Sequence, residues 1–425
     1  MKEGNLMEKK IILCILFFLY GLNNTSFSIG SVRIRLLHIF GLLLAIILFK
    51  GFIVEKEGVK KFFKDVLRCF SNKENGYSIF MMSIWFVYAL ISFFWVLSIP
   101  DWHLAISFFI VGIFCTITFS LFLRTRKDLF QAFQVMGIIS IIHNIIGWYE
   151  VITQDHLFGS RHRWGTRPVS FFYNTNNFAV FLFFAVFILY AIGENSKNIC
   201  LKIFYKIASA SSMLLIYLTQ SRGVFLGLIF SLIILIAFSN IDNIKNYKKR
   251  LSTKVLIIFV ALATIAVVAI LVYMLTVGLD GSNEKRIMDI KNGFTFLFAT
   301  NGFGVGAGNI EYWIEAHLYF ISPRNSSLNM HNWWMEILAA YGVVIFALYL
   351  IFYYKLFKNN FSKFFKSDNL IDKSFSKAML SIMGGFLIVS AVPSTLIFHL
   401  FHWVFWAVAI AFQGVPLEDR VWRKK

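Results

Sequence analysis

The sequence predicts an all-α, polytopic membrane bundle. Of its 425 residues, 58% are hydrophobic and only 15% are charged, and the mean hydropathy is +0.70. Uncharged apolar runs of about 20 residues, the length that a membrane helix needs, recur along the whole chain. A soluble domain does not have the interior to bury that much apolar surface. We therefore expect a single integral membrane domain over residues 1–425.

The apolar runs predict about twelve transmembrane helices. The first run follows Lys9 and Lys10 as a signal peptide would, but it has no small-residue cleavage pattern, so we interpret it as a retained helix. The longest hydrophilic stretch follows the ninth run and predicts one larger loop at about 278–330. The expected helices are 11–29, 36–54, 77–97, 103–123, 129–149, 171–193, 204–221, 223–239, 255–277, 331–354, 379–396 and 397–414.

The distribution of Lys and Arg among the loops predicts the orientation. With the N-terminus in the cytosol, the cytosolic segments carry 31 of the 41 Lys and Arg residues, and the outer segments carry 10. Cytosolic loops of membrane proteins are enriched in these residues, so we expect both termini in the cytosol and the loop 278–330 outside. The net charge of +19 is then a topology signal that meets anionic lipid headgroups, not a nucleic-acid-binding surface.

The two faces also differ in the kind of cation. The cytosolic segments hold 25 Lys and 6 Arg, whereas the outer segments hold 8 Arg and 2 Lys. Topology requires only positive charge, which Lys supplies. Arg adds a planar fork of donors that grips phosphate or carboxylate in bidentate fashion. The outer face is therefore predicted to bind an anionic ligand.

Three outer segments contain the candidate binding groups. They are GSRHRWGTRPVSFFYNTNNFA (159–179), the TQSRG break (219–223), and the large loop with the start of the tenth helix, which ends in NMHNWWMEILAAYG (329–342). The candidate residues are Arg163, Arg167, Asn177, Arg222, Arg286, His331, Asn332 and Glu336.

Arg222 interrupts the apolar run 217–229. A charge at the centre of a bilayer costs at least about 2.5 kcal/mol, so a charge in or near the membrane favours a function. The alternative is a side chain that snorkels to the interface. We expect Arg222 to bind a negative group at the outer leaflet.

Glu336 and His331 stand at the start of the tenth helix. Asn332 and Glu336 are four residues apart and so share one helical face. A carboxylate one turn below the interface needs a partner. His331 precedes Trp333 and Trp334, which are expected to form an aromatic belt at the interface. A histidine at such a position is either inert or able to accept a proton.

The segment NGFGVGAGN (301–309) has four glycines in alternation. It lacks the strand–turn–helix setting of a dinucleotide site, so it predicts a tight turn. If Arg286 and His331, 45 residues apart, serve one reaction, this turn is where the chain folds back. The sequence shows neither metal-ligand spacing nor a Ser-His-Asp set, and we expect no metal and no other cofactor.

The order of these features resembles the O-antigen ligase and O-antigen polymerase superfamily of bacterial membrane glycosyltransferases. The resemblance runs from about 159 to 350. It rests on R-x-x-x-R-P…N-T-N-N-F-A, T-x-S-R-G, an Arg early in the large loop, G-x-G-x-G, and H-N-W-W-x-E-I-L…Y-G. It implies a multi-pass protein of the bacterial cytoplasmic membrane that takes glycans from undecaprenyl pyrophosphate at the outer leaflet.

The resemblance also implies roles for residues. Arg222 and Arg286 are expected to bind the pyrophosphate and His331 to activate the acceptor. Arg163 or Arg167 is expected to be a further phosphate contact. We group Glu336 with the catalytic residues, and we assign substrate binding to two asparagines of the same segments, Asn177 and Asn332.

The function predicted first is polymerisation of a capsule, O-antigen-like or teichuronic-acid-like polysaccharide. A ligase that moves a finished glycan to another acceptor fits the same motifs. A lipid-linked glycan flippase is the alternative of another class, but it should carry charges near the midplanes of several helices and show two similar halves. The expected partners are undecaprenyl-pyrophosphate-linked glycans, membrane lipids and other polysaccharide-assembly membrane proteins, and not nucleic acid.

Overall fold

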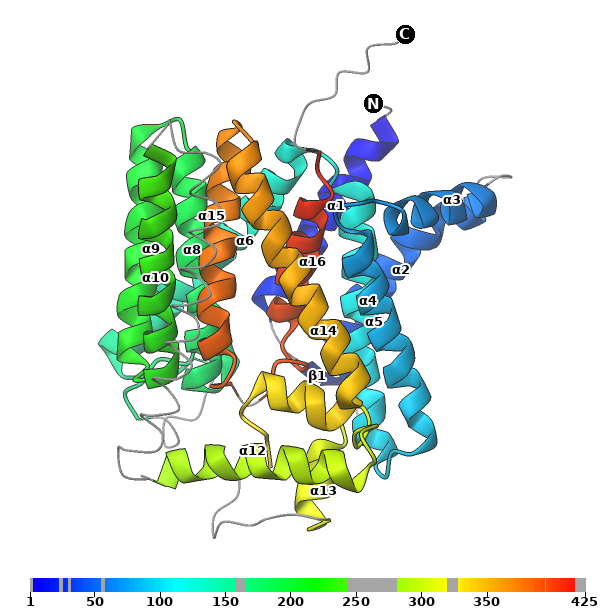
Figure 1. Ribbon diagram of the computed structural model, residues 1–425. Helices are drawn as coiled ribbons and strands as arrows, with labels where there is room; N and C mark the ends of the chain where they lie inside the picture. Colours follow the sequence, from blue (N-terminus) through cyan, green and yellow to red (C-terminus); the bar gives the residue numbers. More distant parts are fainter. Residues whose placement is uncertain are drawn as a thin grey trace.

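The computed structural model of the protein is a bundle of α-helices (Figure 1). It describes residues 3–22, 26–29, 32–54, 58–157, 165–243, 281–318, 328–393 and 395–416. The bundle helices are α1 (Glu3–Gly21), α2 (Leu36–Val54), α4 (Gly76–Ile91), α5 (Ile99–Phe122), α6 (Arg126–Thr153), α8 (Thr175–Asn195), α9 (Ile199–Leu218), α10 (Arg222–Asn243), α14 (Trp333–Lys366), α15 (Leu370–Val389) and α16 (Leu400–Gln413). The all-α prediction is confirmed. The described strands, β1 (Ser26–Ile29) and β2 (Val32–Arg35), form one antiparallel hairpin.

Seven helices in the described part of the chain are long and apolar enough to cross a membrane, namely α4 with the turn after it, α5, α6, α8, α9, α10 and α14. Two shorter apolar stretches lie in α2 and α16. Eleven of the twelve predicted spans overlap a helix, and the remaining one, 255–277, lies outside the described residues. The protein is a multi-pass membrane protein.

Several predicted segments differ from the structure. The first helix ends at Gly21, and residues 26–29 form a strand. The residues between the tenth and eleventh predicted helices, 355–378, are the end of α14 and the start of α15, joined by residues 367–369. In its described residues, the loop predicted at 278–330 contains two helices, α12 (Gly281–Ala299) and α13 (Ile310–Glu315). Hydropathy detects only the apolar part of a helix, whereas helix propagation continues into polar residues.

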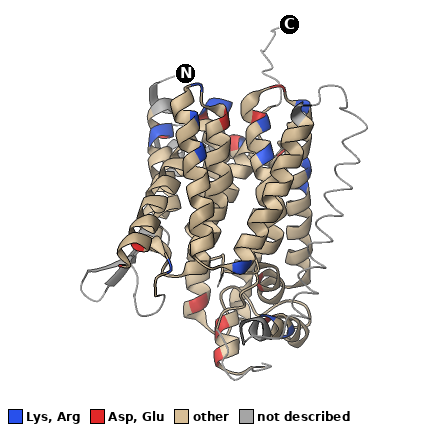
Figure 2. Cartoon of the chain, turned by 90° about the vertical axis from the view of Figure 1, so that its left-hand side faces the viewer, with Lys and Arg blue, Asp and Glu red and all other residues tan. Residues whose placement is uncertain are grey.

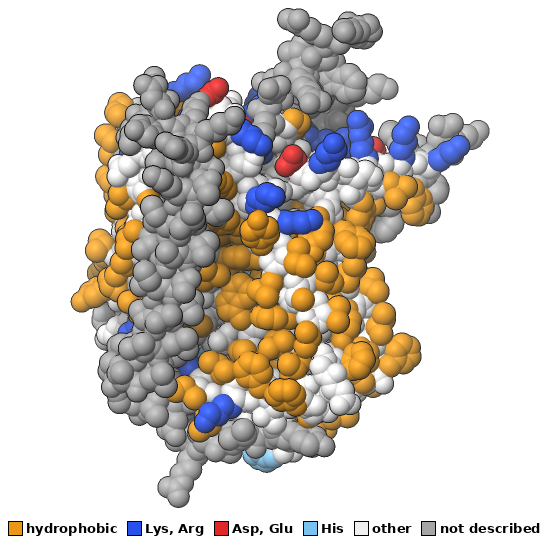
Figure 3. All heavy atoms as spheres, viewed as in Figure 1, with side chains coloured by type: hydrophobic (Ala, Val, Ile, Leu, Met, Phe, Trp, Pro, Cys, Tyr) orange, Lys and Arg blue, Asp and Glu red, His pale blue; other side chains and the backbone are white. Residues whose placement is uncertain are grey.

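The two ends of the bundle differ in charge. α1 starts and α16 ends at the end shown at the top of Figure 1, while α12 and α13 cross the opposite end, which we call the α12 end. Lys and Arg gather at the end where the chain termini lie, the cation-rich end (Figure 2). From this end α3 (Gly58–Phe70) projects sideways, with cations above a broad apolar surface (Figure 3). An apolar band between two polar ends is the shape expected of a protein in a bilayer.

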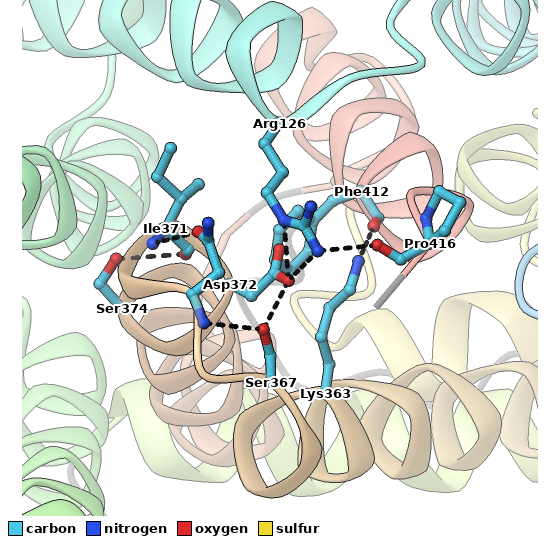
Figure 4. A network of polar contacts seen from close by, with 9 residues as sticks. Arg126, Lys363, Ser367, Ile371, Asp372, Ser374, Phe412 and Pro416 are labelled. Carbon is cyan, nitrogen blue, oxygen red and sulfur yellow. Dashed lines mark hydrogen bonds and ion pairs between the residues drawn. The ribbon is translucent and has the colours of Figure 1, made fainter. Parts of the chain in front are cut away.

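A buried ion pair ties helices together at the cation-rich end (Figure 4). Arg126, at the start of α6, donates hydrogen bonds to Asp372 of α15 from Nε at 3.0 Å and from Nη2 at 2.9 Å. Nη2 also donates to the carbonyl of Pro416, just after α16, at 2.9 Å. Lys363, near the end of α14, donates to the carbonyl of Phe412 in α16 at 2.5 Å. Four helices are therefore fixed to one another at this end.

Replacing Asp372 with Ala should destabilise the protein by roughly 3–5 kcal/mol, because the guanidinium of Arg126, which is largely withdrawn from solvent, would lose its charged partner. The measurement is the apparent melting temperature of purified protein in detergent, together with its level in membranes. Glu74→Ala is the control, since it removes an exposed carboxylate that lies beside α14 near the same end. Equal melting temperatures for the two variants would contradict this structural role.

Trp85 of α4 is the centre of an aromatic core. Its ring contacts Trp333, Tyr341 and Tyr349 of α14 and Trp403 of α16. Trp333 is 1% exposed and donates Nε1–H to the Tyr349 hydroxyl at 2.9 Å. The prediction that Trp333 belongs to an interfacial belt was wrong, because its indole packs inward between α4 and α16. This packing fixes the first turns of α14.

Candidate functional site at the α12 end

The glycine segment 302–308 packs against a break in α14. Gly342 has φ of +74°, and the four glycines of the segment have φ between +71° and +94°. Residues with a side chain rarely adopt these angles, and a Cβ at Gly304 would lie 2.6 Å from the carbonyl oxygen of Ala340. The segment donates two backbone hydrogen bonds of 2.9 Å to the carbonyl groups of Ala339 and Ala340. The predicted turn is thus a docked loop that holds the first half of α14.

Asn309 fastens the other side of the glycine segment. Its carboxamide oxygen accepts the N–H groups of Leu97 at 2.9 Å and Ser98 at 2.7 Å, and its nitrogen donates to the Ser98 carbonyl at 3.0 Å. Trp95 donates Nε1–H to the carbonyl of Gly304 at 3.0 Å. These partners belong to the connection between α4 and α5. Because the segment is anchored on both sides, α13, which follows directly, is held in a fixed position.

Arg222 is the first residue of α10. α9 ends at Leu218, and the chain reverses through a turn in which Gln220 has φ of +58°. Ser221 donates its hydroxyl to the carboxamide oxygen of Asn176 at 2.9 Å, which ties this turn to the start of α8. The side chain of Arg222 is exposed. The sequence break therefore separates two helices and places Arg222 at their joint.

Arg286 lies in α12 and extends to the same turn. Its Nη1 is 3.8 Å from the position that a Cβ would occupy at Gly223. That position is also 2.5 Å from Cγ2 of Val392, so the start of α10 can lie this close to Val392 only because residue 223 is glycine. The guanidinium of Arg286 thus lies beside the backbone that carries Arg222.

α12 extends from the region of Arg222 and Arg286 to the start of α14. Gly293, two turns after Arg286 and on the same face of α12, packs against Met330 and Met335. Seven helical residues span about 10 Å along the axis. Arg286 therefore stands about two turns of α12 away from the residues that flank His331.

The segment after α15 contacts both the turn that carries Arg222 and the start of α14. Val392 packs against Gly223, and the carbonyl of Ser390 accepts the N–H of Trp333 at 2.9 Å. The sequence prediction extended the eleventh helix through these residues, but α15 ends at Val389. The segment that follows α15 therefore connects the region of Arg222 and Arg286 to the start of α14.

Glu336 is buried in α14 and is 7% exposed. Thr395 donates its hydroxyl to Oε1 of this carboxylate, and the N–H of Leu396 donates a second hydrogen bond to it. The partner that a membrane carboxylate requires is thus supplied by a hydroxyl and a backbone N–H. Glu336 lines a cavity of about 30 Å³ that Glu311 of α13 also lines.

His331 precedes α14 in a left-handed backbone conformation, with φ of +44°, and its side chain is partly exposed. Asn332 caps the helix, because its carboxamide oxygen accepts the N–H groups of Trp334 at 3.1 Å and Met335 at 3.2 Å. Asn332, which the sequence analysis assigned to substrate binding, therefore has a structural role. The cap fixes the backbone that presents His331.

The remaining candidates belong to the segment before α8 and to its first turn. Arg163 lies outside the described residues. Arg167 is exposed, in a loop that the buried carboxylate of Glu150 fastens to α6 by accepting two backbone N–H groups at 2.8 Å. Asn177 is buried near the start of α8, with 6% of its surface exposed. Its neighbour Asn176 makes the hydrogen bond to the turn that carries Arg222.

Glu311 is a candidate that the sequence analysis did not identify. It is half-buried in α13. Burial, and then the nearby carboxylates of Asp101 and Glu315, raise the pKa of Glu311 above its ordinary value. Glu311 lies beside Glu336 because of the way the glycine segment docks against α14. The sequence indicates Glu311 only by its position directly after that segment.

The α12 end thus brings together Arg222, Arg286, His331, Glu336 and Glu311. Guanidinium groups stabilise the charge of a phosphate, and a histidine or a carboxylate can accept a proton from a hydroxyl group. Such a set of groups suits a transfer in which a hydroxyl attacks and an anionic group leaves.

The fold and these groups define a multi-pass membrane protein with a polar site at one end of its bundle. Residues 207–350 match the family described as O-Antigen ligase. The chain is also similar to the teichuronic acid biosynthesis protein TuaE of Bacillus subtilis (strain 168), with 29% identity over 355 residues, which are 80% of this chain and 72% of that protein. These matches confirm the resemblance to the O-antigen ligase and O-antigen polymerase superfamily. The family match contains Arg222, Arg286, His331 and Glu336.

Proposed function

We propose that this protein is a membrane glycosyltransferase of cell-surface polysaccharide biosynthesis. It polymerises oligosaccharide units from undecaprenyl-pyrophosphate-linked donors at the outer face of the cytoplasmic membrane. The observation that carries the proposal is that Arg286 lies beside the Arg222 turn, at the end of the bundle that also holds His331 and Glu336. The match to the O-Antigen ligase family and the similarity to a teichuronic acid biosynthesis protein support it.

In the proposed reaction a hydroxyl of the acceptor glycan attacks the anomeric carbon of the lipid-linked donor. A bond forms between the acceptor oxygen and that carbon, and the bond from the carbon to the pyrophosphate oxygen breaks. His331 accepts the hydroxyl proton. Arg222 and Arg286 stabilise the negative charge that leaves with undecaprenyl pyrophosphate, and Arg163 or Arg167 is a further phosphate contact.

Purified protein in nanodiscs, supplied with an undecaprenyl-pyrophosphate-linked repeat unit, tests the proposal. A polymerase releases undecaprenyl pyrophosphate and produces a ladder of longer glycans, which is the result we expect. The description of the matched family favours a ligase as the second candidate, and a ligase would make one transfer to a different acceptor. A donor that binds but releases no undecaprenyl pyrophosphate would contradict both and would favour a flippase.

The orientation of the bundle is a second part of the proposal. Since cytosolic segments are enriched in Lys and Arg, the cation-rich end should face the cytosol and the α12 end the exterior. In a variant without the four native cysteines, Lys291→Cys on α12 should react with a membrane-impermeant maleimide in intact cells. Lys358→Cys on α14 should react only after permeabilisation, and both positions are exposed. Labelling of Lys358→Cys in intact cells would overturn the topology.

A further inference from the structure

The cavity at the α12 end has walls of mixed chemistry. Glu311 and Glu336 face it from α13 and α14, Asn329 adds an amide, Thr395 a hydroxyl and Phe398 an aromatic ring. Its volume of about 30 Å³ exceeds the roughly 10–15 Å³ that a single water molecule needs. The cavity can therefore hold a hydroxyl or a hydroxymethyl group.

The Glu336 carboxylate and the backbone that carries Glu311 are held in place before any ligand binds. Glu336 accepts hydrogen bonds from the Thr395 hydroxyl and the Leu396 N–H. Glu311 follows Asn309 by two residues, and the four hydrogen bonds of the Asn309 carboxamide hold the backbone there. Groups fixed in this way lose little freedom when they bind a ligand.

The cavity also lies next to the predicted proton acceptor. Met330, which lines it, is the residue directly before His331. A sugar whose edge enters the cavity would therefore have its ring close to His331. This position is that of an acceptor rather than of the pyrophosphate, because Arg286 stands about two turns of α12 away from Met330.

We propose that this cavity binds a hydroxyl-bearing edge of a neutral sugar in the acceptor glycan and excludes an anionic sugar. The inference rests on the proposed glycosyl transfer. Carboxylates accept hydrogen bonds from hydroxyl groups, and such charge-assisted bonds are stronger than neutral ones. A uronic acid carboxylate in the same position would be repelled by Glu311 and by Asp101, whose carboxylate lies near it, and like charges brought together at a binding site select against the wrong partner.

Saturation-transfer NMR on the full-length protein in nanodiscs tests this inference with three probes, D-glucose, N-acetyl-D-glucosamine and D-glucuronate. The two neutral sugars should bind and glucuronate should not. Glu311→Gln should weaken the binding of the neutral sugars about tenfold, the factor expected when a hydrogen bond to a charged group is lost. Glu315→Gln is the matched control, because Glu315 is on the same helix but is exposed and is not among the residues that line the cavity. It should bind the sugars as the wild-type protein does.

A separate measurement distinguishes this inference from the proposed function. Binding of undecaprenyl pyrophosphate, followed by tryptophan fluorescence, should be unchanged in Glu311→Gln. If the wild-type protein does not bind undecaprenyl pyrophosphate, the proposed function fails. If it does, but Glu311→Gln binds glucose normally or the wild-type protein binds glucuronate as well as glucose, only the acceptor inference fails. Should Glu311→Gln not fold, Glu311→Asp takes its place, because the shorter side chain keeps the charge but withdraws it from the cavity.

Discussion

Replacing His331 with Ala should lower polymer formation by roughly 10²–10⁴-fold, the range expected when a general base is lost. The protein should remain folded and inserted, because the side chain of His331 is partly exposed and the buried ring of Trp333 holds the start of α14. The measurement is high-molecular-weight polysaccharide on a gel, with the protein level followed by a membrane blot.

Two other variants make this result interpretable. His331→Asn should be as inactive as His331→Ala, and it preserves the backbone, since Asn tolerates the left-handed conformation found at this position. His103→Ala removes an exposed histidine from α5, just after the connection that anchors the glycine segment, and should make normal polymer. Full-length polymer from both His331 variants at normal protein levels would exclude His331 from the mechanism. Stabilisation of charge by the arginines would then remain as the main source of catalysis.

The membrane helices could be predicted because hydropathy is a local property of the sequence. The TQSRG break at 219–223 could be predicted for the same reason, since one arginine in an apolar run is costly wherever the run folds. The ends of the helices could not be predicted from hydropathy. For example, α14 continues to Lys366 because its last turns are polar but still hydrogen-bonded. Local composition therefore predicts where a chain enters the membrane better than where its helices stop.

The docking of the glycine segment could not be predicted from the sequence. Four alternating glycines indicate left-handed backbone angles, but the partner of this segment is a helix break at Gly342, which only the tertiary structure brings beside it. The same contact positions Glu311, so this carboxylate was missed. Trp333 was assigned to the interface for a related reason, because its burial depends on α4 and α16 rather than on its own neighbours in the sequence.

Arg222→Lys should lower the rate of transfer by about 10²–10³-fold, the usual effect of removing one preorganised donor from a developing negative charge. Lys keeps the positive charge but cannot reproduce the bidentate grip of a guanidinium on phosphate. Arg286→Lys should have an effect of similar size. The measurement is the release of undecaprenyl pyrophosphate in nanodiscs, and Lys291→Ala, an exposed cation on the same face of the bundle, should be close to wild type.

The double variant shows whether the two arginines act on one pyrophosphate. Residues that share a ligand have non-additive effects, whereas independent sites multiply. Since Arg286 lies 3.8 Å from the Cβ position of Gly223, next to Arg222, the combined loss in Arg222→Lys/Arg286→Lys should be smaller than the product of the two single losses. A loss equal to that product would mean that the two side chains serve separate sites. Near-normal polymer from Arg222→Lys alone would mean that Arg222 is an interfacial anchor, and pyrophosphate binding would then depend on Arg286 and the arginines before α8.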